Sequence, residues 1–160
     1  MNKARVVGLA VFVLLSLAAG ALGALWTAPA TQPGGWYSQI EKPSWTPPSW
    51  LFGPVWTALY VAMGVAAWLV WKNGGWEANR GALTLFFVQL VLNAAWSGLF
   101  FGLESPGLAM AEIVLLWMFI LATLLAFWRV SRPAGLLFVP YLLWVTFASA
   151  LNFAVWRLNG

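Results

Sequence analysis

Five long apolar runs constrain the fold of this chain more than any other feature. A membrane-spanning helix needs about 20 mainly apolar residues. Five stretches reach that length: 6–25, 50–71, 81–103, 108–128 and 134–156. They are continuous, without the ten-residue alternation of a barrel strand, which favours helices. We therefore predict an all-α membrane protein: a single domain over 1–160, built as a five-helix transmembrane bundle with a lid loop over 26–49.

The charged residues fit a membrane protein and argue against a nucleic-acid partner. Only 8% of the residues are charged, against about 25% in a soluble domain, and the net charge of +4 is spread over the predicted helix ends. One side would hold Lys3, Arg5, Lys72, Arg80, Arg129 and Arg132, and the other Lys42 and Arg157. If the membrane is an inner, bacterial cell membrane, the positive-inside rule puts the N-terminus in the cytoplasm and the C-terminus outside. An outer membrane stays open, because the rule does not apply there in the same way.

The first apolar run has a second interpretation. Lys3 and Arg5 precede an apolar core and the small residues 18–23, a pattern typical of a cleaved signal peptide. The run continues to Leu25, however, and is long enough to span. We favour a retained helix.

The residue types that usually carry catalysis are scarce. The chain has no His, Cys or Asp, and three of its four Glu residues fall in predicted connections. The fourth, Glu112, lies about one turn inside the fourth helix, where either a functional role or an interfacial position near the helix dipole accounts for it. We expect neither a metal site nor a hydrolytic active site.

The connection after the first run is rich in Trp and Pro. It contains Trp36, Tyr37 and the run Lys42-Pro43-Ser44-Trp45-Thr46-Pro47-Pro48. Proline stiffens the backbone, and Trp combines an apolar body with one N–H. This composition predicts a rigid aromatic lid over a helical bundle, or an aromatic belt that anchors the loop at the lipid headgroups.

Aromatic and polar residues repeat at helical spacing on three of the predicted helices. The three stripes are Trp56 with Tyr60; Asn93, Trp96 and Ser97; and Tyr141, Trp144, Ala148 and Asn152. Residues three or four apart share a helix face. Aromatic walls with a few polar groups are typical of a small-molecule site. The alternative is ordinary hydrogen bonding between packed helices.

Small residues form a separate stripe on the third predicted helix. Ala94, Gly98 and Gly102 are spaced by four, and such stripes let helices approach closely in lipid. We predict that the stripe is a homodimer contact. Packing against another helix of the same subunit is the alternative.

Several motifs occur together and in order along the chain: Trp36-Tyr37, the Lys42–Pro48 run, Trp56 with Tyr60, Asn93-Ala94-Ala95-Trp96-Ser97, Val139-Pro140-Tyr141-Leu142-Leu143-Trp144 and Leu151-Asn152-Phe153. They resemble the tryptophan-rich sensory protein family, also known as the translocator protein or peripheral-type benzodiazepine receptor family, here a bacterial member. The resemblance implies a homodimeric five-helix bundle whose cavity is closed by the first loop and binds porphyrins and other tetrapyrroles. It also implies drug or sterol binding in some members, and light-dependent porphyrin breakdown in some bacterial ones.

The resemblance also implies roles for single residues. Trp36 and Tyr37 would belong to the lid, while Trp56, Asn93, Trp144 and Ala148 would line the cavity. Trp56 and Trp144 match the pair implicated in porphyrin photochemistry. The family's sterol motif corresponds to Leu151, Phe153 and Arg157, with Phe153 where the motif has Tyr, and such motifs are weak.

We therefore expect a membrane tetrapyrrole-binding protein for sensing or transport, with no obligatory cofactor. Because the chain lacks His and Cys, the commonest axial ligands of haem iron, metal-free porphyrin is the preferred ligand. The alternative is a structural or regulatory membrane protein that acts through partner contacts, with drug or sterol binding incidental.

Overall fold

The computed structural model describes residues 3–160, which fold into helices without any strand. The elements are α1 (Lys3–Thr31), α2 (Trp36–Gln39), α3 (Ser49–Trp71), α4 (Gly75–Ser97), the π-helix η1 (Gly98–Gly102), α5 (Pro106–Val130) and α6 (Arg132–Asn159). Helix α4 continues into η1. Five of the resulting helices within 3–160 are long and apolar enough to cross a membrane. The predicted all-α, five-helix membrane fold is confirmed.

Two helix boundaries differ from the predicted ones by six residues, and the others agree within three. Helix α1 runs to Thr31, six residues beyond the predicted end. The hydroxyls of Thr27 and Thr31 bond back to the carbonyls of Gly23 and Thr27, at 3.1 and 2.9 Å, so these polar residues fit inside a helix. Helix α4 begins at Gly75 rather than 81, after Gly74 and Gly75 turn the chain tightly with positive φ of 126° and 73°. A kink at Asn79 (φ −120°, ψ 20°) separates this first turn from the rest of α4, which starts close to the predicted boundary.

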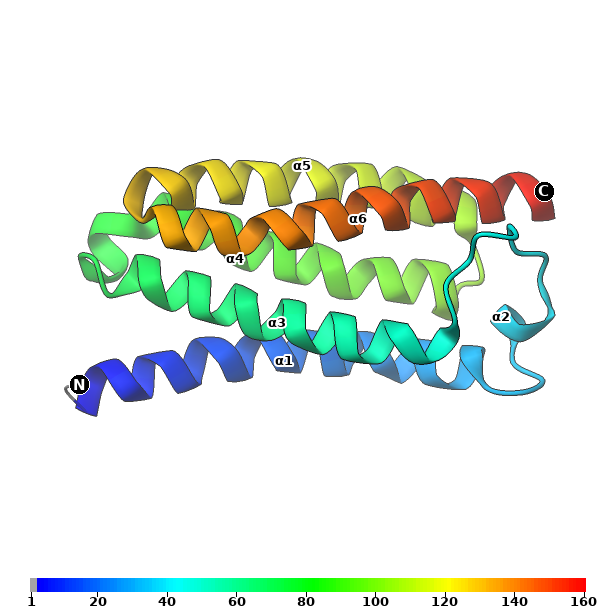
Figure 1. Ribbon diagram of the computed structural model, residues 1–160, viewed down its shortest axis with the longest axis horizontal. Coiled ribbons are helices and arrows are strands. Elements are labelled where there is room, and N and C mark those ends of the chain that lie inside the picture. Colours follow the sequence, from blue (N-terminus) through cyan, green and yellow to red (C-terminus); the bar gives the residue numbers. More distant parts are fainter. Residues whose placement is uncertain (1–2) are drawn as a thin grey trace.

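The five long helices form a closed ring in the order α1, α3, α6, α5, α4, each packed against its neighbours. Figure 1 shows the N-terminus at one end of the bundle and the C-terminus at the other. The connection that holds α2 lies at the C-terminal end. We call this the loop end, and the opposite end the N-terminal end.

The half of the bundle nearer the N-terminal end is a solid core. Phe86, Phe127 and Phe138 are fully buried there, with the Phe127 and Phe138 rings edge to face at 5.2 Å. Helices α1 and α3 cross closely because Gly64 has no side chain. A Cβ on Gly64 would lie 2.5 Å from the Cα of Val13. Such close backbone packing is typical of helices in lipid.

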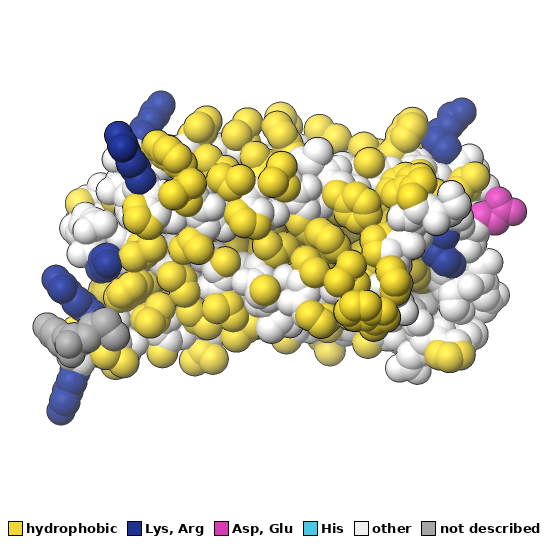
Figure 2. Space-filling view, viewed as in Figure 1, with side chains coloured by type: hydrophobic (Ala, Val, Ile, Leu, Met, Phe, Trp, Pro, Cys, Tyr) yellow, Lys and Arg dark blue, Asp and Glu magenta, His cyan; other side chains and the backbone are white. Residues whose placement is uncertain are grey.

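The outer surface matches a membrane-spanning orientation. Figure 2 shows hydrophobic side chains over the middle of the bundle, with Lys and Arg near its two ends. Leu14, Leu25 and Val91 are 64, 68 and 68% exposed, although they are purely apolar. Exposed leucines and valines in the central part of every long helix indicate a surface that contacts lipid rather than water.

Candidate functional site

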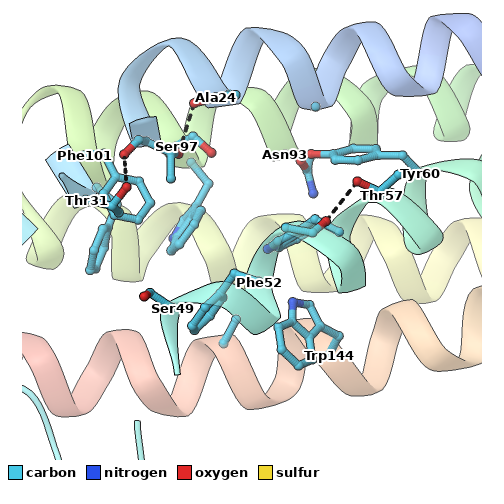
Figure 3. Close-up of a pocket in the computed structure, with 18 of the residues that line it drawn as sticks. Ala24, Thr31, Ser49, Phe52, Thr57, Tyr60, Asn93, Ser97, Phe101 and Trp144 are labelled. Carbon is cyan, nitrogen blue, oxygen red and sulfur yellow. Dashed lines mark hydrogen bonds between the residues drawn. The ribbon is translucent and has the colours of Figure 1, made fainter. Parts of the chain in front are cut away.

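A cavity of about 670 Å³ fills the loop-end half of the bundle (Figure 3). Its size is within the range of small-molecule sites. Residues of α1, α2, α3, α4, η1 and α6 line it. Its larger side chains are Tyr37, Trp50, Phe52, Trp56, Tyr60, Trp96, Phe100, Phe101 and Trp144. Figure 3 shows Tyr60 and Asn93 together on one side of this space and Phe52 and Trp144 on the other.

Helix α3 supplies a continuous aromatic wall. Phe52, Trp56 and Tyr60 are spaced by four, so their rings follow one another along one helix face. The rings of Trp56 and Tyr60 are stacked, with centroids 5.6 Å apart and planes at 30°. Phe52 meets the ring of Trp144 on α6 edge to face at 5.9 Å. The aromatic walls of α3 and α6 therefore join at a corner of the cavity.

Trp144 presents a free hydrogen-bond donor at this corner. Its Nε1 is buried and has no partner among the described residues. A buried donor without a partner is uncommon in folded proteins, and here it belongs to a side chain that lines the cavity. One turn further along α6, the small side chain of Ala148 leaves the space open.

Trp96 and Asn152 tie three helices together at the loop end of the cavity. The indole N–H of Trp96 donates to Oδ1 of Asn152 at 3.0 Å, and Nδ2 of Asn152 donates to the carbonyl of Pro106 at 2.8 Å. Trp96 also stacks on Phe100, at 5.1 Å and 24°. Phe100 lies in the π-helix η1, and short π-helices occur frequently at functional sites.

A chain of hydrogen bonds closes the inner end of the cavity. The Tyr60 hydroxyl donates to Oδ1 of Asn93, and Nδ2 of Asn93 donates to the Tyr141 oxygen at 2.8 Å. Tyr141 in turn donates to Oε1 of Gln89 at 2.8 Å. Gln89 and Tyr141 are fully buried. We call Tyr60, Asn93, Tyr141 and Gln89 the floor network.

The connection before α3 covers the loop end of the cavity. Tyr37 lines the cavity, and its ring meets Phe101 edge to face at 5.5 Å. Burial raises the pKa of Tyr37 above its usual value, so the hydroxyl stays neutral at physiological pH. Lys42 holds the end of α2: its Nζ donates to the carbonyls of Tyr37 and Ile40 at 2.6 and 2.8 Å.

A second set of contacts fastens this connection to α6. The backbone N–H of Glu41 donates to Oδ1 of Asn159 at 3.0 Å, and Nδ2 of Asn159 donates to the Glu41 carbonyl at 2.9 Å. The rings of Trp45 and Phe147 meet edge to face at 5.8 Å. The connection is therefore docked on the bundle rather than free in solvent.

Nine of the eleven predicted ligand residues line this one cavity, and their role in binding stays a prediction. They are Tyr37, Trp56, Tyr60, Asn93, Trp96, Ser97, Trp144, Ala148 and Asn152. Tyr141 does not line it, because its ring lies in the solid core and its hydroxyl belongs to the floor network. Trp36 does not line it either. Its ring packs edge to face on Phe100 at 5.6 Å, and Phe100 in turn contacts the ring of Tyr37 at 6.1 Å.

The wall formed by α1 was not predicted from the sequence. Apart from Leu17, it consists of small and polar residues: Gly20, Ala21, Gly23, Ala24, Thr27 and Thr31. Gly20 makes room for the ring of Tyr60, and Gly23 makes room for the Ser97 hydroxyl. The signal for this wall is the repeat of Gly, Ala and Thr every three or four residues along the first apolar run.

The small-residue stripe on α4 and η1 has a contact inside the chain. A Cβ on Gly102 would lie 2.7 Å from the ring of Trp26 on α1, and one on Gly98 would lie 3.8 Å from it. Trp26 is itself 41% exposed, and Ala94 is half-buried. The alternative of packing within the subunit therefore applies to both glycines. A homodimer contact on the same face stays a prediction.

Two further predicted features lie wholly or partly outside the cavity lining. Both carboxylate oxygens of Glu112, in the second turn of α5, are buried without a partner among residues 3–160. The sterol motif is split between two faces of α6. Leu151 is buried and faces the cavity, whereas Phe153 is 50% exposed and Arg157 lies in the exposed last turn.

Known proteins match this chain over nearly its whole length. The model of the TspO/MBR family matches residues 12–157. The chain is 49% identical to the tryptophan-rich protein TspO of Chlorobaculum tepidum, over 99% of each chain. It is 44% identical to protein CrtK of Rhodobacter capsulatus, over 94% of this chain and 91% of the relative. It is 39% identical to the translocator protein of Bos taurus, over 92% of this chain and 88% of the relative.

Proposed function

The chain belongs to the TspO/MBR family, and we propose that it binds a metal-free porphyrin in the cavity beneath the α2 connection, for sensing or transport. The observation that carries this proposal is the cavity of about 670 Å³, which has Trp56 on one wall and Trp144 on another. Both side chains are half-buried, so their rings are supported by the bundle yet open to a ligand.

The chemistry of the walls suits a flat aromatic ligand with a polar edge. Indole and phenyl faces stack on a macrocycle, and each such pair adds about 0.5–1.5 kcal/mol beyond area burial. The unpartnered N–H of Trp144 offers a donor to an acceptor on the ligand. The hydroxyls of Ser97 and Thr57 also line the space.

The residue types of the chain favour the metal-free porphyrin over haem. No His or Cys occurs anywhere in the sequence, and these side chains are common axial ligands of haem iron. A third axial ligand, Met, is available in principle, but none of the four Met residues lines the cavity. Tyr is a fourth type of ligand, and two Tyr residues line the cavity: Tyr60 is engaged with Asn93, and burial raises the pKa of Tyr37, which disfavours the phenolate that iron would bind.

A titration of the purified protein with metal-free porphyrin tests this function. Trp56, Trp96 and Trp144 would lie against a bound macrocycle, so the proposal expects saturable quenching of Trp fluorescence at one porphyrin per chain. Quenching that rises linearly without saturation would indicate partition into detergent or lipid only. That result would favour the alternative function, a structural or regulatory role through contacts with a partner.

Light-dependent breakdown of the bound porphyrin is a second candidate activity. The observation that favours it is that Trp56 and Trp144 line the same cavity. Indole is readily oxidised, so it can donate one electron to a photoexcited porphyrin in contact with it. Dioxygen then adds to the porphyrin radical and cleaves one bridge of the macrocycle, and the electron returns to the indole radical cation, so that the net change is addition of one dioxygen to the porphyrin. The ring of Trp56 stacks on Tyr60 and faces the cavity from α3, so it is placed to contact a bound porphyrin.

We further propose that the protein is a homodimer in the bacterial cell membrane, with its N-terminal end in the cytoplasm. The N-terminal end of the bundle carries six of the eight Lys and Arg residues, and Figure 2 shows positive side chains gathered near that end. Positive residues are retained on the cytoplasmic side of an inner membrane. The loop end, with the cavity, then faces the other side.

A further inference from the structure

We propose that the ligand enters and leaves the cavity sideways from the bilayer, through a mouth between α1 and α3, and not from water past the α2 connection. The mouth is framed by Ala21 and Ala24 on α1 and by Gly53 and Thr57 on α3. This inference rests on the proposed porphyrin binding. It adds the class of ligand that the site takes: a flat amphiphile dissolved in the membrane.

The first observation is that the four residues of the mouth are both cavity-lining and exposed, as are Thr31, Ser49 and Trp50 further along the same two helices towards the loop end. Tyr60 and Asn93 line the same cavity, yet they are only 8 and 3% exposed. A Cβ built on Gly53 would meet no atom within 4 Å. The cavity is therefore walled at its inner end and open between these two helices. In Figure 3, Ala24 lies on α1 and Thr57 on α3.

The second observation is where α1 and α3 hold together. Towards the N-terminal end, the backbone of Val13 crosses Gly64, and further along Gly20 receives the ring of Tyr60. Beyond Tyr60, in the direction of the loop end, the facing residues Ala21, Ala24 and Gly53 are too small to bridge the two helices. The mouth therefore lies where the side chains between α1 and α3 are small, although the two helices pack closely elsewhere.

The third observation is the depth of the mouth. Ala21 lies ten residues before the end of α1 at Thr31, which is about 15 Å along a helix with a rise of 1.5 Å per residue. Thr57 lies about 12 Å inside α3 by the same measure. With the bundle centred on a hydrocarbon core about 30 Å thick, Ala21 and Thr57 would lie within the core, and Gly53, four residues from the start of α3, would lie near its edge. The neighbours of the mouth on α1, Leu22 and Leu25, are 53 and 68% exposed, as expected for side chains that contact lipid.

The fourth observation is that the α2 connection is fastened to the bundle. Entry past the α2 connection would break the paired hydrogen bonds between Glu41 and Asn159 and the contacts of Lys42 with the end of α2. Entry through the mouth breaks none of the hydrogen bonds of the described residues.

Substitution of Gly53 by Phe tests the mouth, because the open space around this glycine accepts a large side chain. Metal-free porphyrin is exchanged between phosphatidylcholine vesicles and proteoliposomes, and Trp quenching is followed in time. We expect both association and dissociation of porphyrin to slow by about tenfold or more, equivalent to about 1.4 kcal/mol of barrier. A Phe side chain that merely crowded the bound porphyrin would speed dissociation instead. Gly81→Phe is the matched control, since Gly81 is also an exposed helical glycine with open space around it.

A loop lock provides the opposite arm of the test. The chain has no Cys, so Glu41→Cys with Asn159→Cys creates a single disulfide pair where the loop meets α6. We expect equal porphyrin exchange rates in the oxidised and reduced forms. Slower exchange on oxidation, or wild-type exchange rates in Gly53→Phe, would overturn the mouth while leaving porphyrin binding intact. Absence of saturable porphyrin binding in the wild type would overturn both.

Discussion

Tyr60 donates a hydrogen bond to Asn93 across the α3–α4 interface, and this contact separates the cavity from the solid core. Tyr60 faces the cavity, whereas the other partner of Asn93, Tyr141, is fully buried. The inner end of the site is therefore part of the polar network that holds α3, α4 and α6 together. The proposed ligand site and the polar network that stabilises the bundle therefore share Tyr60 and Asn93.

Tyr60→Phe is expected to lower stability modestly while keeping the fold. It removes the donor to Asn93 and keeps the ring that stacks on Trp56. Hydrogen bonds between helices in a membrane are worth about 0.6 kcal/mol on average and at most about 1.7, so the free energy of unfolding is expected to fall by about 0.5–1.7 kcal/mol. In a double-mutant cycle, Tyr60→Phe and Asn93→Ala should be clearly non-additive. Strict additivity would show that the bond contributes nothing.

Gly98→Leu is expected to convert a cross-linked dimer to monomer with little loss of thermal stability. A Cβ at Gly98 makes only an ordinary 3.8 Å contact with Trp26, so the bundle tolerates the change. Gly102→Leu is the comparison, because its Cβ would clash with Trp26 at 2.7 Å and should lower stability as well. An unchanged dimer population in Gly98→Leu would exclude this face of α4 and η1 from the dimer interface. Gly98 and Gly102 would then serve only packing against Trp26 of the same subunit.

Single cysteines at Gly34 and Gly74 test the orientation of the bundle. Gly34 lies in the α1–α2 connection at the loop end, and Gly74 lies in the turn between α3 and α4 at the N-terminal end. An impermeant thiol reagent applied to intact cells should label Gly34→Cys and spare Gly74→Cys until the membrane is opened. Labelling of Gly74→Cys alone in intact cells would reverse the proposed orientation.

Trp144→Phe and Trp56→Phe separate porphyrin binding from its breakdown by light. Phe keeps an aromatic face but is much harder to oxidise than indole. We expect affinity for porphyrin to fall by less than about tenfold, or 1.4 kcal/mol, while the light-driven loss of the porphyrin spectrum falls much more. Wild-type photobleaching in both variants would eliminate the photochemical role of this pair, and Trp26→Phe, outside the cavity lining, controls for general indole content.

Hydropathy alone was sufficient to predict the five helices, because lipid-facing and buried positions are both apolar and the runs are continuous. The end of α1 was missed because Thr27 and Pro29 interrupt the apolar run. The hydroxyl of Thr27 donates a hydrogen bond to the carbonyl of Gly23 in the preceding turn, so the helix continues past this polar residue.

Helical spacing identified most of the predicted residues that line the cavity, but not how deeply each side chain lies in the bundle. Tyr141, Trp144 and Ala148 share a face of α6, yet Tyr141 lies deeper, where the helices converge on the core and Gln89 accepts its hydrogen bond. Spacing gives the direction of a side chain and not the distance to the facing helix. For the same reason, nothing in the dipeptide Trp36-Tyr37 determines which of the two rings faces the cavity, because that depends on how α2 docks.

The measurement that tests the central claim most directly is the porphyrin stoichiometry of Ala148→Trp. Ala148 lines the cavity and leaves its α6 wall open, so an added indole fills the space in which the macrocycle would lie. The matched control is Ala58→Trp, which adds the same group to an exposed position of α3 outside the lining. We predict one porphyrin per chain for the wild type and Ala58→Trp, and an affinity at least about tenfold weaker, or 1.4 kcal/mol, for Ala148→Trp. Equal stoichiometry and affinity in all three proteins would contradict porphyrin binding in this cavity.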